Sequence, residues 1–120
     1  MLRVVQDEAE RAEFAGILDE IVRDGARRML AVALEAEVDA YVTAAKGERD
    51  DNGRALVTRN GKARARSVVT GAGALEIRSP RVNDKRTDEH GERVRFASDI
   101  LPPYARRSPK VSEVLPLLYL

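Results

Sequence analysis

Apolar side chains recur at helical spacing along the first third of the chain. Residues 8–45 are rich in Ala, Glu, Arg and Leu and contain no proline, a composition that favours helix. Gly25 interrupts the pattern and can mark a kink or a break between two helices. Steps of three and four residues predict one wide hydrophobic stripe on this helix. Its members are Phe14, Ile17, Leu18, Ile21, Val22, Met29, Leu30, Ala33, Leu34, Val38, Tyr41 and Val42.

A stripe of this length has to be covered, because helices in water owe most of their stability to the packing of an apolar face. Two arrangements provide that cover. The helix can pack on the rest of its own chain, or it can pair with another helix across a dimer. Both remain open, so the helical region 1–46 is a candidate dimerisation region.

Beyond a charged linker at residues 47–54, the pattern changes from helical to extended. Leu56-Val57-Thr58 precedes Arg59-Asn60-Gly61, and Asn-Gly between extended segments predicts a tight hairpin turn. The run 67–70 follows, with β-branched residues at 68–70, and the glycines at 71 and 73 can turn the chain again. We therefore expect an antiparallel β-meander in the region 55–82, with strands from about residue 55 to 79 closed by Pro80.

The last third of the chain is divided into two regions. Residues 83–95 are almost entirely polar and predict a mobile loop. Residues 96–120 predict an irregular packed segment and a short C-terminal helix that begins at Ser108, with Pro109 in its first turn. That helix ends on an apolar run, which is typical of a truncation. The predicted fold class is α+β, with a long helix or helix pair, a small meander and a short final helix.

Charge is distributed unevenly, although the net charge is only +1. Residues 1–50 contain 7 Lys and Arg against 12 Asp and Glu, whereas residues 51–120 contain 14 against 8. A basic second half favours a polyanionic partner. The chain has no cysteine and one histidine, which excludes disulfides, thiolate zinc sites and histidine-rich metal sites. No signal peptide or membrane span is apparent, so we expect a cytoplasmic protein without a membrane partner.

The predicted meander carries the main candidate site, a cluster of basic residues. Such a cluster suits the phosphates of double-stranded DNA, and a two-stranded ribbon can also enter the major groove. A solvated basic hairpin that contacts nothing in particular is the alternative. A second basic patch precedes the predicted last helix. The candidate DNA-binding residues are Arg59, Lys62, Arg64, Arg66, Arg78 and Arg81 in the meander, and Arg106 and Arg107 in the second patch.

No catalytic residues and no metal ligands are predicted. Glu35 and Asp39 lie on the polar face of a helix, and the other carboxylates fall in linkers and loops. Metal-assisted phosphoryl transfer needs several carboxylates held rigidly around its ions, and no predicted element supplies that scaffold. We therefore expect no cofactor in this chain.

Read in order, three segments resemble the beginning of the bacterial mutator-type transposases. The first is the helix 25–41, rich in Ala, Leu and Glu. The second runs from Arg59-Asn60-Gly61 to Pro80-Arg81-Val82. The third contains Ile100-Leu101-Pro102 and ends at Leu118-Tyr119-Leu120. Together they cover nearly the whole chain from about residue 15, although Lys62 stands where the family usually has an aromatic.

The resemblance implies a DNA-binding N-terminal region that recognises the terminal inverted repeats of its transposable element. It also implies a later ribonuclease-H-like domain, whose two Asp and one Glu hold divalent metal and cut DNA. None of that domain's motifs is present in residues 1–120, so we expect a fragment that binds DNA without cutting it. Two functions stay open: DNA binding, or a non-catalytic interaction protein that dimerises through the long helix and modulates an intact transposase. A homo-oligomer or an intact transposase is accordingly an expected partner.

Overall fold

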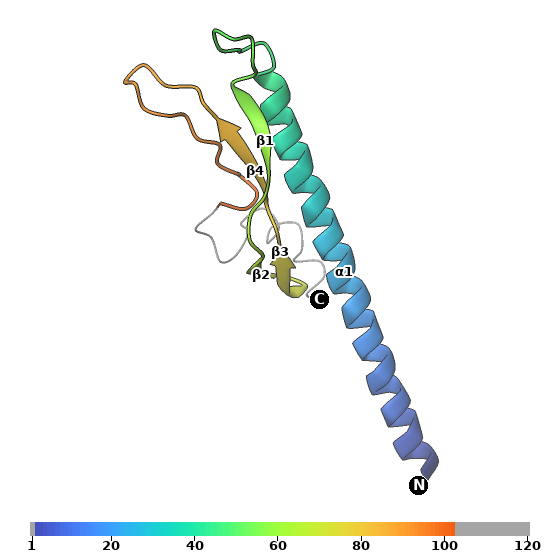
Figure 1. The fold of residues 1–120 in the computed structure, drawn as a ribbon. Coiled ribbons are helices and arrows are strands. Elements are labelled where there is room, and N and C mark those ends of the chain that lie inside the picture. Colours follow the sequence, from blue (N-terminus) through green and yellow to red (C-terminus); the bar gives the residue numbers. More distant parts are fainter. Residues whose placement is uncertain (1, 103–120) are drawn as a thin grey trace.

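The structure is a computed structural model that describes residues 2–102, with side chains from residue 7 onward. One long helix is followed by four short antiparallel strands (Figure 1). This arrangement confirms the predicted α+β class. The predicted helix from Ser108 and the candidate residues Arg106 and Arg107 lie outside the described residues.

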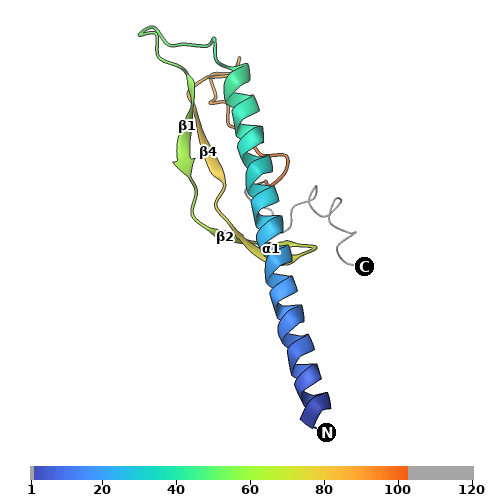
Figure 2. The ribbon, with the colours of Figure 1, turned by 90° about the vertical axis from the view of Figure 1, so that its right-hand side faces the viewer.

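Helix α1 spans Leu2–Ala44 without interruption. At 1.5 Å per residue its 43 residues extend about 65 Å. The N-terminal half runs on well beyond the strands, as Figures 1 and 2 both show. Gly25 introduces no break: ion pairs from Asp24 to Arg27 and Arg28 span it, and the helix packs on the strands from Ala26 onward.

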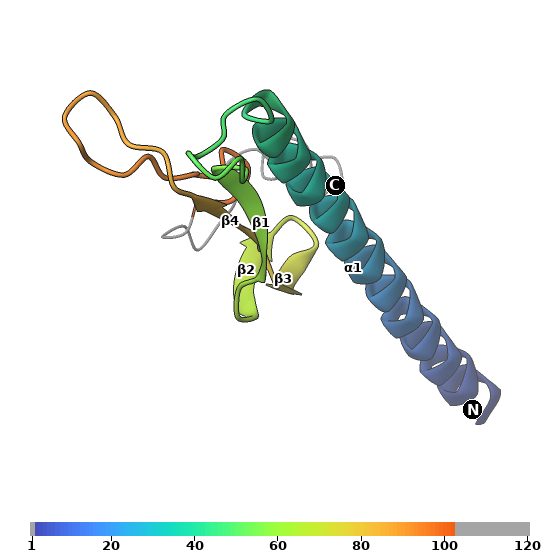
Figure 3. The same ribbon diagram turned by 45° about the horizontal axis from the view of Figure 1, so that its top comes forward.

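The four strands form two nested antiparallel pairs. Strands β2 (Arg66–Thr70) and β3 (Gly73–Ile77) make the inner hairpin. Strands β1 (Val57–Lys62) and β4 (Pro80–Asp84) pair outside it. A backbone hydrogen bond from Ala63 N to Ser79 O, 2.8 Å, joins the two pairs. The result is one long, bent two-stranded ribbon that lies against α1 (Figure 3).

The predicted hairpin at Asn60-Gly61 is wrong, and so is the meander order, because β1 pairs with β4 rather than with β2. Gly61 has a φ of 64° and lies where the register shifts between Arg59 and Lys62. It therefore forms a β-bulge inside a strand. The chain turns instead at Gly71-Ala72, where the Thr70 hydroxyl accepts a hydrogen bond from Ala72 N. Pro80 begins β4 instead of closing the strands.

The hydrophobic core joins one face of α1 to the inner hairpin. Leu34, Val68 and Leu75 are almost completely buried within it. Leu101 brings the segment after the strands into the same cluster, and the Glu37 carboxylate accepts hydrogen bonds from Ser98 Oγ and Asp99 N. The core residues are Ala26, Leu30, Leu34, Val68, Leu75, Ile77 and Leu101.

Candidate nucleic-acid interface

The nested strand pairs separate the predicted basic residues into two groups. Arg59 belongs to the group on the α1 side. Its guanidinium forms ion pairs with Glu35, at 2.6 Å, and with Asp39. Hydrogen bonds to Asp39 and then Glu35 raise the pKa of Arg59 above its ordinary value. Arg59 therefore ties β1 to α1 instead of presenting a free cation.

Lys62 and Arg78 also lie on the α1 side. Together with Val32, Glu35 and Asp39 they line an open cavity of about 380 Å³ between the helix and the ribbon. The Nε atom of Arg78 donates a hydrogen bond to Ala63 O across the ribbon, 3.1 Å. Both side chains remain exposed, but carboxylates of the same protein lie beside them.

Arg64, Arg66 and Arg81 line a different cavity, on the other side of the ribbon. Its volume is about 430 Å³, and Pro80 and Phe96 form part of its apolar floor. Arg66 is half-buried, and its Nη2 donates to the carbonyl of Pro102 at 2.8 Å. Arg66 therefore holds the segment after the strands in place, whereas Arg64 and Arg81 are exposed to solvent.

A second cavity, also of about 430 Å³, adjoins the first. The two share Arg81, Val82 and Phe96, and no described residue of α1 lines either one. We call their combined surface the basic groove. Its exposed arginines are Arg64, Arg81, Arg93 and Arg95, and its exposed or half-exposed amides are Asn60 and Asn83.

Arg93 and Arg95 were not among the predicted site residues, because they fall in the region predicted to be a polar loop. Residues 85–95 instead fold back on themselves. Val94 N donates to Arg86 O at 3.0 Å, and Thr87 pairs with Arg93. The turn of this arm projects away from α1, while its return brings Arg93 and Arg95 beside β4 (Figures 1 and 3). The alternation Arg93-Val94-Arg95 was the available signal, since it places both arginines on one face of an extended segment.

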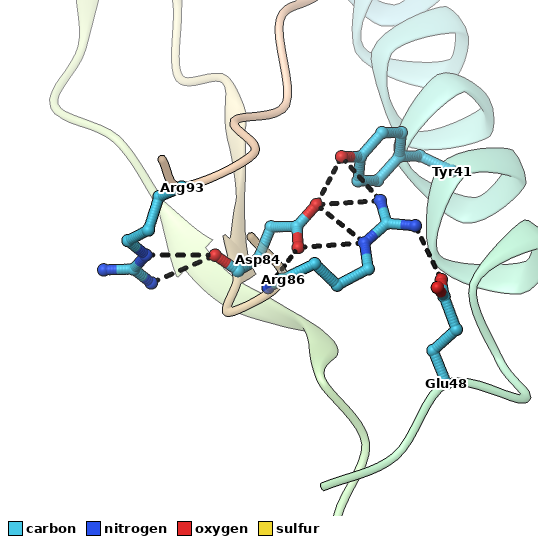
Figure 4. Close-up of polar contacts among 5 residues, drawn as sticks. All are labelled: Tyr41, Glu48, Asp84, Arg86 and Arg93. Carbon is cyan, nitrogen blue, oxygen red and sulfur yellow. Dashed lines mark hydrogen bonds and ion pairs between the residues drawn. The ribbon is translucent and has the colours of Figure 1, made fainter. Parts of the chain in front are cut away.

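A polar network fixes the end of β4 against the helix. Asp84 is buried and accepts hydrogen bonds from Arg86 Nη2, at 2.9 Å, and from the Tyr41 hydroxyl, at 2.5 Å (Figure 4). Arg86 also pairs with Glu48 at 2.6 Å. The hydrogen bonds from Arg86 outweigh desolvation and lower the pKa of Asp84 to about 2. Burial and the bond to Asp84 raise the pKa of Tyr41.

The same network sets the position of Arg93. Its guanidinium donates to the carbonyl oxygen of Asp84, at 3.0 Å, and to Asn83 Oδ1, at 3.1 Å. Figure 4 shows Arg93 and Arg86 approaching Asp84 from opposite sides. Asp84 is the one acid among the described residues that line the basic groove. Because Arg86 neutralises its carboxylate, Asp84 adds little negative charge to the groove.

The arrangement suits anion binding better than acid–base or metal chemistry. Exposed guanidinium groups on a firmly held ribbon can contact successive phosphates. Among residues 2–102 no three His, Asp or Glu side chains lie together as metal ligands. In the same part of the chain, no helix combines the length and the apolar character needed to cross a membrane.

Comparison with known proteins agrees with the resemblance noted from the sequence. No curated protein matches the chain. A family model described as "Transposase, Mutator family" matches residues 2–120. Since the match spans nearly the whole sequence, the chain belongs to the Mutator family of transposases.

Proposed function

We propose that this chain is a DNA-binding part of a Mutator-family transposase, and that it recognises the terminal inverted repeats of its transposable element through the basic groove. The observation that carries the proposal is the placement of Arg64, Arg81, Arg93 and Arg95 on one side of the ribbon. Because the chain belongs to a transposase family, DNA is the polyanion that we expect it to bind.

The geometry favours duplex DNA over a small anion as the ligand. The groove is open and consists of two adjoining cavities, so its cations are spread along the β1–β4 ribbon instead of converging on one point. A two-stranded ribbon fits the major groove of B-DNA, where arginine can read guanine while neighbouring arginines contact phosphates. Asn60 and Asn83 add amide groups of the kind that pair with adenine.

We further propose that the chain binds DNA without cutting it and needs no cofactor to do so. Its best-placed carboxylates are already engaged: Glu35 and Asp39 pair with Arg59, and Asp84 pairs with Arg86. Binding should therefore be unchanged in EDTA. A loss of the protein–DNA complex on chelation would contradict this part of the proposal.

Direct binding measurements test the function. The ligand is a labelled duplex carrying the inverted repeats that flank the reading frame, and a shuffled duplex of equal length is the comparison. Arg81→Gln/Arg95→Gln removes two charges from the groove, and Arg11→Gln/Arg23→Gln removes two charges from α1 as the matched control. We expect the groove variant to lose about 10-fold or more in affinity while the control stays close to wild type. Equal affinity of all three proteins would refute DNA binding through the groove.

A second function is favoured by the exposed apolar side chains of α1, among them Phe14 and Ile21. They suit a non-catalytic protein that pairs with an intact transposase and modulates it. Co-purification with a full-length homologue, combined with no DNA shift at low salt, would support this function over the first.

A further inference from the structure

Helix α1 carries two apolar faces, and the described chain covers only one. The covered face contains Ala26, Leu30, Leu34 and Val38. The other face is exposed: Ile21 and Met29 are each 61% accessible, and Val32 is 69% accessible. We call this second face the exposed stripe. Its members are Phe14, Ile17, Leu18, Ile21, Val22, Met29 and Val32.

The exposed stripe lies about half a turn around the helix from the covered face, as follows from about 100° per residue. Between Phe14 and Val32 it is about 27 Å long. Its first part lies on the half of α1 that runs on beyond the strands (Figures 1 and 2). The ribbon cannot cover both faces at once, because it already packs on the opposite side.

An uncovered stripe of this size indicates an interaction surface. Single exposed apolar residues are ordinary, but seven large ones along one side of one helix are not, even though Gly25 and Arg28 separate Val22 from Met29. The half of α1 beyond the strands has no other source of tertiary stability among the described residues, and isolated helices are marginal in water. Pairing with a second helix would supply that stability.

The charge along α1 indicates which partner fits. Residues 7–20 contain six acids and one base, whereas residues 21–34 contain three bases and one acid. Two copies aligned in parallel would place acid beside acid. Two antiparallel copies would place the acidic half of each helix beside the basic half of the other. The charges of the two helices therefore attract each other in the antiparallel orientation.

A second feature supports the same orientation. The exposed stripe ends at Val32, which lines the open cavity that also contains Lys62 and Arg78. When residues 7–20 of one copy lie against 21–34 of the other, the segment around Glu10 lies near residue 31 of the partner helix. Glu35 and Asp39 line the same cavity, but both are paired with Arg59. The acidic end of one copy therefore lies near the cations Lys62 and Arg78 of the other.

We propose that the chain forms a homodimer in which the exposed stripes of two α1 helices pack against each other in antiparallel orientation. The proposal goes beyond the proposed function and does not depend on DNA binding. In this dimer the two ribbons lie toward opposite ends of the helix pair, each with its basic groove away from the stripe.

Sedimentation equilibrium of the full chain tests the surface. Leu18→Gln/Ile21→Gln alters the stripe without changing charge, and Ala9→Gln/Ala12→Gln makes the same kind of change on the other side of the same helical stretch. We expect the stripe variant to weaken the dimer by about 100-fold or more, because four apolar side chains lose their cover. The control should stay within about threefold of wild type. A wild-type chain that stays monomeric at about 100 µM would overturn the proposal, as would a stripe variant that dimerises normally.

Cysteine cross-linking tests the orientation in a chain that has no cysteine of its own. Ile21 lies at the midpoint of the antiparallel pair, so Ile21→Cys should form a disulfide-linked dimer. In the same pair two copies of Phe14 lie about 20 Å apart along the axis, so Phe14→Cys should not cross-link. Equal cross-linking at both positions would show a parallel pair and overturn the antiparallel arrangement. Because the readout contains no DNA, it is independent of the proposed function.

Discussion

At the scale of single residues, Asp84 connects α1, the segment after β4 and the returning arm that carries Arg93. It accepts hydrogen bonds from Tyr41 on α1 and from Arg86 after β4, while its own carbonyl holds Arg93. A buried carboxylate with charged partners is costly to protonate. The carboxylate network fixes the end of β4, and the backbone carbonyl of Asp84 at that end holds Arg93 in the basic groove.

The lowered pKa of Asp84 predicts a specific acid sensitivity. Its pKa falls from an ordinary 3.8 to about 2, so the stabilisation is present above pH 3.8 and is lost as pH falls toward 2. That stabilisation amounts to about 2 kcal/mol. Urea unfolding at pH 5, 4, 3 and 2 measures it, with Asp84→Asn as the variant and Asp51→Asn, in an exposed loop, as the control. The difference in the free energy of unfolding between wild type and Asp84→Asn should become smaller below pH 4. A constant gap would show that Asp84 does not carry the effect.

Arg59 is predicted to behave differently from the groove arginines. Its ion pairs with Glu35 and Asp39 are solvent-exposed, so Arg59→Gln should cost less than about 1 kcal/mol of stability. Because the guanidinium is occupied by carboxylates, the same change should lower DNA affinity far less than Arg81→Gln. Unfolding and anisotropy titrations of both variants provide the comparison. A DNA-binding loss at Arg59 equal to that at Arg81 would place the interface on the α1 side of the ribbon.

At the scale of elements, the helix was predictable from the sequence and the strand pairing was not. Apolar spacing and the absence of proline were enough for α1. Asn60-Gly61 was misleading because turns and bulges both need a residue with positive φ, and glycine supplies it in either. Only pairing with β4 distinguishes them. The basic charge of residues 54–81 was likewise evident from the sequence. The side of the ribbon on which Arg59 and Arg64 lie depends on the strand pairing, and the place of Arg95 in the groove depends on the fold of the arm.

The bulge assignment predicts that Gly61→Ala is destabilising. Nothing lies within 4 Å of an added Cβ, so the cost is the backbone conformation at φ 64°, about 1–2 kcal/mol. Gly47→Ala is the matched control, because Gly47 has equal space and no positive φ. Urea unfolding measures both variants. Equal stability of the two proteins would contradict a left-handed conformation at residue 61.

The opposite sign is expected for Gly16 on α1. It is exposed, has open space for a Cβ and lies within the helix, so Gly16→Ala should stabilise the helix by about 0.5–1 kcal/mol. Hydrogen exchange of residues 10–22 measures the local effect, and protection there should increase. Unchanged protection would indicate that this stretch is not helical in solution.

At the scale of the whole molecule, the two proposed functions, DNA binding and dimerisation, use different surfaces. One side of the ribbon packs in the core and forms ion pairs with α1. The other side forms the basic groove. The exposed stripe faces away from the core. A dimer built on the stripe would leave both grooves open, so one assembly could hold two DNA ends. The stability of α1 and the binding of DNA can thus be changed separately.

The salt dependence of binding to the terminal-repeat duplex tests DNA binding by the basic groove most directly. Each DNA phosphate that the protein no longer neutralises lowers the slope of log affinity against log salt by about 0.9, so Arg81→Gln/Arg95→Gln should flatten that slope by about 1.8. Arg11→Gln/Arg23→Gln should leave it as in wild type. An unchanged slope in the groove variant, or an equal change in the control, would show that the basic groove does not hold DNA.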